Sequence, residues 1–169
     1  MKLTTLGCWG AYPYKDGGTT SYLVTSEDGF QLLMDCGSRA VTELEKEISP
    51  LDLDAVIISH YHPDHVADLG VLRHYFQLYP KHLWEPKILP IYGHTEDEQE
   101  FAKLTLDGVS QGKAYDVNGV EKIGPFDITF IKTVHPVPCY AFRIVEHATG
   151  QTLVFTGDTG YFEGLDKFA

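Results

Sequence analysis

The chain has 169 residues, of which 43% are hydrophobic and 22% charged, and this suits one domain with an apolar core over residues 1–169. The formal net charge of −11 excludes a general attraction to nucleic acid or anionic membranes, although a metal-lined cleft could still accept a phosphate. We expect a cytoplasmic protein that does not bind membranes, because the three cysteines form no CxxC pair and no apolar run resembles a signal peptide or a membrane span.

The first part of the chain is expected to consist mainly of strands. The turn Glu27-Asp28-Gly29 predicts a hairpin between two of them. A short amphipathic helix is expected over residues 41–48, before Pro50. The run over 53–59 is continuously apolar, which is typical of a strand buried on both faces. The strands are expected over residues 2–6, 20–25, 30–35 and 53–59.

The second part begins with helices and ends in strands. Apolar residues recur at helical spacing over 65–79, and Thr95 with Glu98 predicts a capping box at the start of a helix over 95–106. Together the elements indicate a mixed α/β (α+β) protein with two sheets and not a regular βαβ repeat. The later strands are expected over residues 87–92, 114–117, 128–134, 139–145 and 152–156.

Four potential metal ligands lie within six residues, directly after the apolar strand over 53–59. The segment reads His60-Tyr61-His62-Pro63-Asp64-His65. Because residues two apart point the same way in an extended chain, His60 and His62 can share one ion. Imidazole and carboxylate groups suit zinc, manganese or iron. A solvated polar loop is the alternative, but three imidazoles and a carboxylate in one turn favour a metal site.

Two later residues follow predicted strands in the same way. His135 comes after the strand over 128–134, and Asp158 lies in a Thr-Gly-Asp-Thr-Gly segment after the last strand. Taken alone, each is more simply an ordinary loop residue. Strand ends are where α/β scaffolds present their sites, so beside the first motif we expect both to be metal ligands.

The segment HYHPDH resembles the HxHxDH motif of the metallo-β-lactamase superfamily, and TGDTG resembles its bridging-aspartate motif. The resemblance implies an αββα sandwich with the metals at one edge of the two sheets. Within the superfamily the chain resembles the ribonuclease Z-like phosphodiesterase branch. The segments that carry this second resemblance are residues 6–13, 18–24, 34–37 and 135–143.

The resemblance also implies two divalent ions, with zinc preferred and manganese or iron as alternatives. The activity implied is hydrolysis by a metal-bound hydroxide, with Asp64 as the general base. Asp35 either orients a ligand histidine or only forms a turn. The ligands implied are His60, His62 and His135 for one ion, Asp64 and His65 for the other, and Asp158 for both.

The superfamily pattern continues beyond residue 169, with a further histidine ligand and a histidine that protonates the leaving group. We therefore expect the sandwich to be incomplete at the C-terminus, with a weak second metal site and low turnover. Uncovered apolar surface favours association, so a homodimer is expected.

The leading functional hypothesis is a metal-dependent phosphodiesterase that acts on a small phosphodiester or an RNA 3′ end. The chain has no long basic insertion that could grip tRNA, which favours the smaller substrate. The alternatives are another hydrolase, acting on a thioester, lactone or β-lactam, or a non-catalytic metal-binding fragment.

Several other residues have weaker functional interpretations. His94 follows Gly93 at a predicted strand end and could border the cleft. Trp9, Tyr12 and Tyr14 either line the cleft or pack the edge of the domain. We expect Cys36 and Cys139 in the core, and surface positions for His74, His82 and His147.

Overall fold

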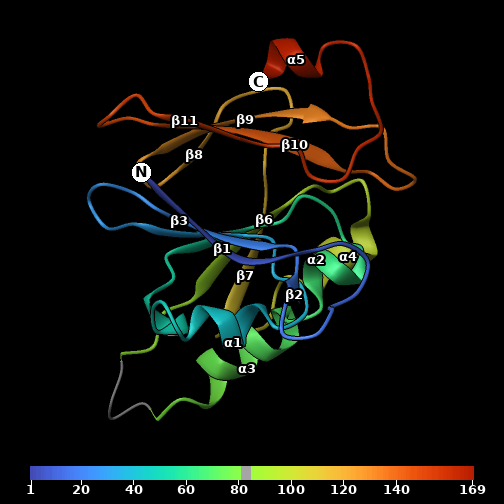
Figure 1. Cartoon of the computed structure of the whole chain (residues 1–169). Coiled ribbons are helices and arrows are strands. Elements are labelled where there is room, and N and C mark those ends of the chain that lie inside the picture. The colour runs from blue at the N-terminus through green and yellow to red at the C-terminus, as the bar shows by residue number, and fades with distance from the viewer. Residues whose placement is uncertain (81–84) are drawn as a thin grey trace.

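The computed structural model describes residues 1–80 and 85–169, which form two β-sheets stacked face to face (Figure 1). Helices α1 (Ala40–Leu44) and α3 (Leu69–Leu78) lie against the outer face of the larger sheet. The short helix α5 (Leu165–Phe168) lies beyond the smaller sheet. The mixed α/β class and the two sheets predicted from the sequence are confirmed.

The larger sheet has seven strands in the order β2-β1-β3-β4-β5-β6-β7. Strand β3 pairs antiparallel with β1 and β4, and β4 to β7 run parallel. Parallel strands end at the same edge of a sheet, so the loops after β4, β5 and β6 meet there. The strands are β1 (Lys2–Trp9), β2 (Gly18–Thr19), β3 (Ser21–Thr25), β4 (Gln31–Met34), β5 (Ala55–Ile57), β6 (Leu89–Gly93) and β7 (Ser110–Ala114).

The smaller sheet has four antiparallel strands in the order β11-β10-β9-β8. The loops that follow β9 and β11 carry His135 and Asp158. The strands are β8 (Glu121–Ile123), β9 (Phe126–Lys132), β10 (Tyr140–Glu146) and β11 (Thr152–Phe155).

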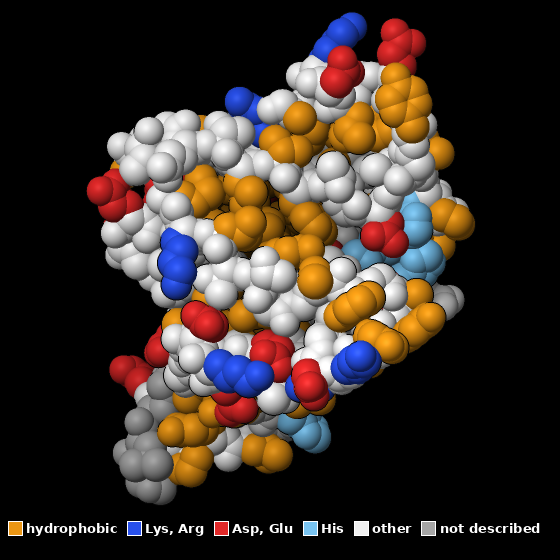
Figure 2. Space-filling view, in the orientation of Figure 1, with side chains coloured by type: hydrophobic (Ala, Val, Ile, Leu, Met, Phe, Trp, Pro, Cys, Tyr) orange, Lys and Arg blue, Asp and Glu red, His pale blue; other side chains and the backbone are white. Residues whose placement is uncertain are grey.

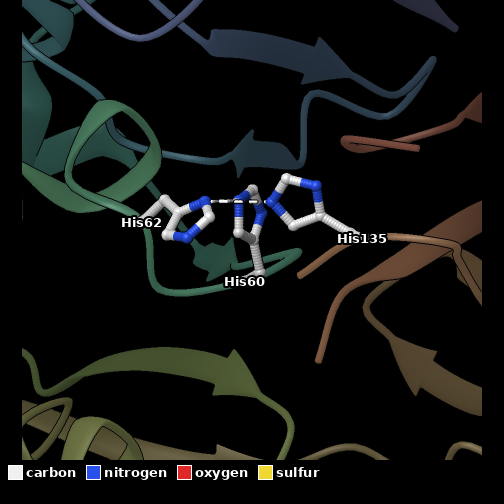
Figure 3. A group of neighbouring side chains, drawn as sticks. All are labelled: His60, His62 and His135. Atoms are coloured by element: carbon white, nitrogen blue, oxygen red, sulfur yellow. Dashed lines mark hydrogen bonds between the residues drawn. The ribbon is translucent and has the colours of Figure 1, made fainter. Parts of the chain in front are cut away.

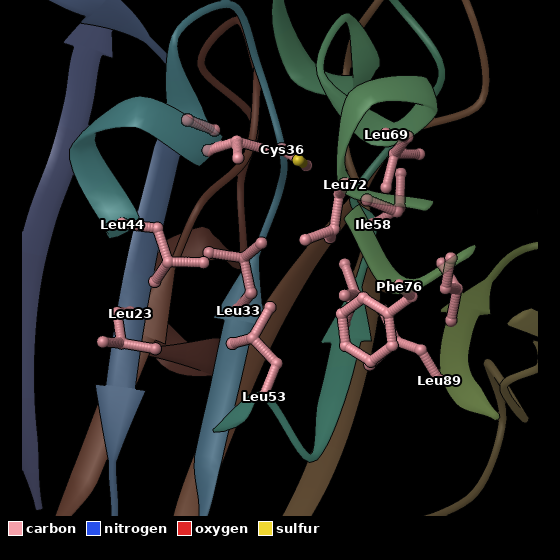
Figure 4. Close-up of a cluster of buried hydrophobic side chains, with 14 of the residues drawn as sticks. Leu23, Leu33, Cys36, Leu44, Leu53, Ile58, Leu69, Leu72, Phe76 and Leu89 are labelled. Atoms are coloured by element: carbon pink, nitrogen blue, oxygen red, sulfur yellow. The ribbon is translucent and has the colours of Figure 1, made fainter. Parts of the chain in front are cut away.

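The central strands β4 and β5 of the larger sheet are buried on both faces, which explains their continuous apolar runs. One face carries Leu33 and Val56, which pack with Leu72 of α3 (Figure 4). The opposite face carries Leu32 and Ile57, which pack against the smaller sheet. The alternation of side chains along a strand places neighbouring residues in these two different cores.

The prediction of one helix over 65–79 is wrong in one respect. The segment forms two helices, α2 (Pro63–Val66) and α3. Between them the backbone bonds to the loop after β4. Cys36 N–H donates to the His65 carbonyl at 2.7 Å, and Asp68 N–H donates to the Cys36 carbonyl at 3.1 Å. These hydrogen bonds replace the continuation of one helix and fix the motif loop to β4.

The helix predicted over 95–106 is also wrong in its bounds, because α4 covers Glu98–Ala102. Its cap is Asp97, whose carboxylate accepts the Glu100 N–H at 3.0 Å, and not Thr95 as the capping box predicted. Helix α1 likewise ends at Leu44, earlier than expected.

The strand predicted over 114–117 is misplaced, because β7 precedes it, and β8 was not predicted. Strand β7 lies at the edge of its sheet and contains the polar and small residues Gln111, Gly112 and Lys113. Edge strands commonly carry such residues, so β-propensity gives little signal there. The other predicted strands are confirmed with small shifts of their ends.

Apolar side chains are exposed between the two sheets on the face shown in Figure 2. A hollow of about 280 Å³ there is lined by Leu3 of β1, Met34 of β4 and Phe155 of β11, among others.

Among the described residues, none of the helices has the length and apolar character that a membrane span requires.

Candidate metal centre

The motif loop lies where β5 ends, at the edge shared by the two sheets. The backbone N–H of Ile58 still bonds to the carbonyl of Tyr92 on β6 at 2.9 Å. The chain then leaves the sheet, and His60 is completely buried. His62 directly precedes α2, and Asp64 and His65 lie on this helix. Pro63 begins the helix, where its missing N–H costs nothing because an N–H at this position would have no partner within the helix.

Three histidines from both sheets converge at this edge (Figure 3). Each of His60, His62 and His135 offers a ring nitrogen within 4.8 Å of the others. The Nδ1 atom of His62 lies 3.1 Å from His60 Nε2 and 2.9 Å from His135 Nε2. One ring nitrogen has a single hydrogen or a single lone pair in the ring plane, so it cannot bond well to both neighbours. A cation between the three rings would satisfy all of them.

The environment favours the neutral form of two of these rings, those of His60 and His135, and metal ligation requires neutral imidazoles. Burial lowers the pKa of His60 to about 2, and the neighbouring histidines reinforce this shift. Burial also lowers the pKa of His135, against the opposing charge of Asp158. Neutral imidazoles expose the lone pairs that bind a metal ion.

A second group of donors adjoins the first and shares His60 with it. It consists of His60, His65 and Asp158, whose ligand atoms lie within 4.8 Å of one another. The Nε2 atom of His65 lies 3.4 Å from Asp158 and 3.6 Å from Asp64. This nitrogen is buried and has no hydrogen-bond partner among the described residues. An orphaned buried nitrogen that faces two carboxylates fits a second cation.

Asp35 orients one of these histidines from behind. Its Oδ2 accepts a hydrogen bond from His65 Nδ1 at 2.7 Å, which turns Nε2 toward the site. Burial lowers the pKa of His65, but the hydrogen bond and charge of Asp35, together with the charges of Asp158 and Asp64, outweigh burial and raise the pKa. Of the two interpretations of Asp35, the structure supports the orienting role, with the backbone in the left-handed region at φ 54°.

Ser59 belongs to the same network, and no sequence motif indicated it. Its N–H and hydroxyl donate to the two carboxylate oxygens of Asp35, each at 2.8 Å. The hydroxyl also lies 3.1 Å from His60 Nδ1. One buried carboxylate therefore positions both His60 and His65. Only the position of Ser59 directly before His60 could have signalled this role.

The loop after β1 reaches the site through its backbone. The N–H of Ala11 donates to Asp64 Oδ2 at 2.8 Å, and Ala11 has a positive φ of 62°. Trp9 and Tyr14 contact each other with ring centroids 5.2 Å apart, and Tyr12 is 70% exposed. Trp9, the last residue of β1, and Tyr14 thus pack against each other beside the loop that holds Asp64.

The remaining histidines and cysteines differ in their exposure to solvent. His74 is exposed, and His147 lies 2.9 Å from Asp127 at the surface. His82 lies outside the described residues. Cys36 and Cys139 are buried as predicted, and burial raises the pKa of Cys139 to about 11, so its thiol stays protonated. His94 is not at the surface, since it is buried beside the motif loop.

Comparisons with known proteins agree on one family. The model of the "Metallo-beta-lactamase superfamily" matches residues 14–168. The "Probable metallo-hydrolase YhfI" of Bacillus subtilis is 41% identical over 169 residues, which cover 100% of this chain and 68% of that protein. A ribonuclease Z of Methanopyrus kandleri is 29% identical over 140 residues, or 82% of this chain and 48% of that protein. The chain thus spans only part of the length of these relatives.

Solved structures show the same fold. The crystal structure of YhfI from Bacillus subtilis matches with a TM-score of 0.89 and 42% identity, covering 98% of this chain and 66% of that one. The short form of human tRNase Z matches with a TM-score of 0.73 and covers 97% of this chain and 71% of that one. Its 21% identity supports a common fold alone.

Proposed function

The chain belongs to the metallo-beta-lactamase superfamily, and from this premise we propose that it is a metal-dependent phosphodiesterase. The observation that carries the proposal is the pair of donor groups that share His60. The ribonuclease Z relatives favour a phosphodiester over the other substrates of such hydrolases. We assign one ion to His60, His62 and His135, the other to Asp64 and His65, and Asp158 to both.

The donor set fits two divalent cations, for which zinc is our first choice because imidazoles dominate, with manganese and iron as alternatives. When bound, such a pair supplies positive charge that polarises a phosphoryl oxygen and acidifies water. The chain's own residues then have separate tasks. Asp35 and Ser59 hold two histidines in place, and the Ala11 N–H holds one oxygen of Asp64.

Asp64 is the proposed general base. It is 9% exposed, and the Ala11 hydrogen bond directs its carboxylate toward the His65 Nε2 atom 3.6 Å away. A carboxylate fixed at this place can accept a proton from the attacking water. The net charge of −11 opposes a long anionic RNA, so we propose a small phosphodiester as the first choice and an RNA 3′ end as the second.

The test is hydrolysis of bis(p-nitrophenyl) phosphate by the chain loaded with zinc or manganese. A chromogenic β-lactam and an aryl thioester serve as competing substrates. We expect phosphodiester hydrolysis, and at least a roughly 100-fold loss in His62→Ala because a ligand is removed. His74→Ala, which changes an exposed histidine, should retain activity. Hydrolysis of the β-lactam or thioester alone would overturn the proposal.

A further inference from the structure

A cavity of about 190 Å³ adjoins the candidate metal centre on the side of α4. His62 lines this cavity and also belongs to the group of three histidines, so a molecule bound at that group can extend into the cavity. Val137 and Pro138, from the loop between β9 and β10, also line it. Pockets for whole drug-sized ligands measure roughly 300–1,000 Å³, so this one suits a single ring system.

His94 lines the same cavity, with one ring nitrogen near the Pro138 carbonyl and the other without a polar partner among the described residues. It follows β6 and is 2% exposed. Burial lowers its pKa, against the charge of Glu96 and the Pro138 carbonyl, so the ring is neutral near pH 7. A neutral imidazole has one donor and one acceptor nitrogen. Buried groups of this kind are normally satisfied, which points to a ligand.

Two carboxylates on the wall give the cavity its charge. Asp97 Oδ1 caps α4, and Glu100 Oε1 accepts a hydrogen bond from Lys103 Nζ at 2.5 Å. The second oxygen of each carboxylate remains able to accept a donor from a ligand. Their negative charge repels a phosphate. The phosphate must therefore stay at the metal ligands, and the cavity receives an uncharged, hydrogen-bond-donating part of the substrate.

Tyr61 also lines the cavity. Its hydroxyl already donates to the His94 carbonyl at 2.7 Å, and its ring lies 4.6 Å from the His94 ring, measured between centroids. The hydroxyl is therefore occupied, and the ring is fixed in place. Aromatic faces of this kind stack on the planar bases of nucleic acids.

From these contacts we propose that the cavity binds the amino-bearing nucleobase of a nucleotide phosphodiester, with His94 and Glu100 as specificity-determining residues. The amino group donates to the carboxylate, the base stacks on Tyr61, and His94 pairs with a ring or exocyclic atom. The inference rests on the proposed function, because it names the substrate class of the same site.

The experiment measures binding and needs no turnover. Adenosine 5′-monophosphate is compared with purine riboside 5′-monophosphate, which lacks only the amino group, by calorimetric titration of the zinc-loaded chain. One lost hydrogen bond to a charged acceptor predicts roughly tenfold tighter binding of the adenine compound. Glu100→Gln and His94→Phe should reduce this preference to about twofold or less. Glu98→Gln, an exposed change on the same helix, should retain it.

Equal binding of the two nucleotides to the unchanged chain, or a full preference in both variants, overturns the subsite. If His94→Phe does not fold, Glu100→Gln decides alone, because Glu100 is only half-buried. Hydrolysis of the aryl phosphodiester without an adenine preference overturns the subsite and leaves the proposed activity standing. An adenine preference without hydrolysis supports the subsite and contradicts the proposed activity.

Discussion

The two halves of the candidate metal centre differ in how firmly the fold holds them. On the side of the larger sheet, His60 and Asp35 are 0% exposed and His65 is 1% exposed. On the side of the smaller sheet, the side chains of His135 and Asp158 are 14% and 43% exposed. The first half is enclosed by packed residues, and the second is more open to solvent.

The hydrogen bonds follow the same division. Asp35 and Ser59 fix the ring orientations of His60 and His65 from behind. The side chain of Asp158 is close to His65 and His135, which are themselves candidate ligands. A site built in this way has one half oriented before the metal arrives, whereas the other half depends on the metal for its geometry. Three experiments test this difference.

The largest expected effect compares a ligand from the enclosed half with one from the exposed half, both assigned to the same ion. His60 is completely buried and lies against Ser59, whereas the side chain of His135 is 14% exposed. His60→Gln should therefore weaken the binding of that ion by more than about 100-fold, and His135→Gln should weaken it by less. Zinc titration with metal analysis at equilibrium gives both affinities, and circular dichroism controls for folding. Equal losses of metal affinity in the two variants would contradict the difference between the enclosed and the exposed half.

A smaller effect is expected from the residue behind the ligands. Asp35→Asn leaves every proposed ligand in place but replaces the acceptor that orients His65 Nδ1. Loss of such a partner lowers metal affinity by roughly 10–100-fold. Zinc affinity from competition with a chelator provides the measurement. Asp52→Asn is the matched control, because this exposed aspartate lies away from the site. An unchanged zinc affinity in Asp35→Asn would mean that metal binding does not depend on the orientation of His65 by Asp35.

The smallest effect concerns the pH dependence of stability without metal. The pKa is about 2 for His60 and is lowered from the ordinary 6.5 for His94 and His135, so near pH 6.5 these rings bind fewer protons in the folded chain than in the unfolded chain. Stability should therefore fall as the pH drops below 6.5, by up to about 1.4 kcal/mol per pH unit for each histidine. The raised pKa of His65 acts oppositely, because its contribution is present below pH 6.5 and is lost as the pH rises through the folded pKa.

His60, with a pKa of about 2, stays neutral across this whole range, so we expect net destabilisation on acidification. Urea unfolding of the metal-free chain in a chelator, at pH 7 and at pH 5, measures it. The window lies above the ordinary pKa of 4.5 of the glutamates, which keeps their titration small. Stability that stays constant or rises toward pH 5 would show that the enclosed rings are not held neutral.

The sequence alone was enough to predict the family, the two sheets and the six proposed ligands. These depend on local patterns, namely apolar runs for strands and the tight spacing of His60, His62, Asp64 and His65 after one of them. His135 and Asp158 were found because they also follow strands, and strand ends meet at one edge in this kind of fold. The lengths of α1 and α4 and the edge strand β7 were not predicted, since tertiary hydrogen bonds and edge positions override weak local preferences.

Only the tertiary structure decided which residues surround the ligands. Asp35 lies 30 positions from His65, and Tyr61 lies 33 positions from His94, yet each pair is joined by a hydrogen bond. Such contacts arise because β4, β5 and β6 are neighbours in the sheet, and sheet order is not written in the spacing of any one segment. The sequence therefore determined which groups can bind metal, and the packing of distant strands determined how two of them are oriented and what cavity lies beside them.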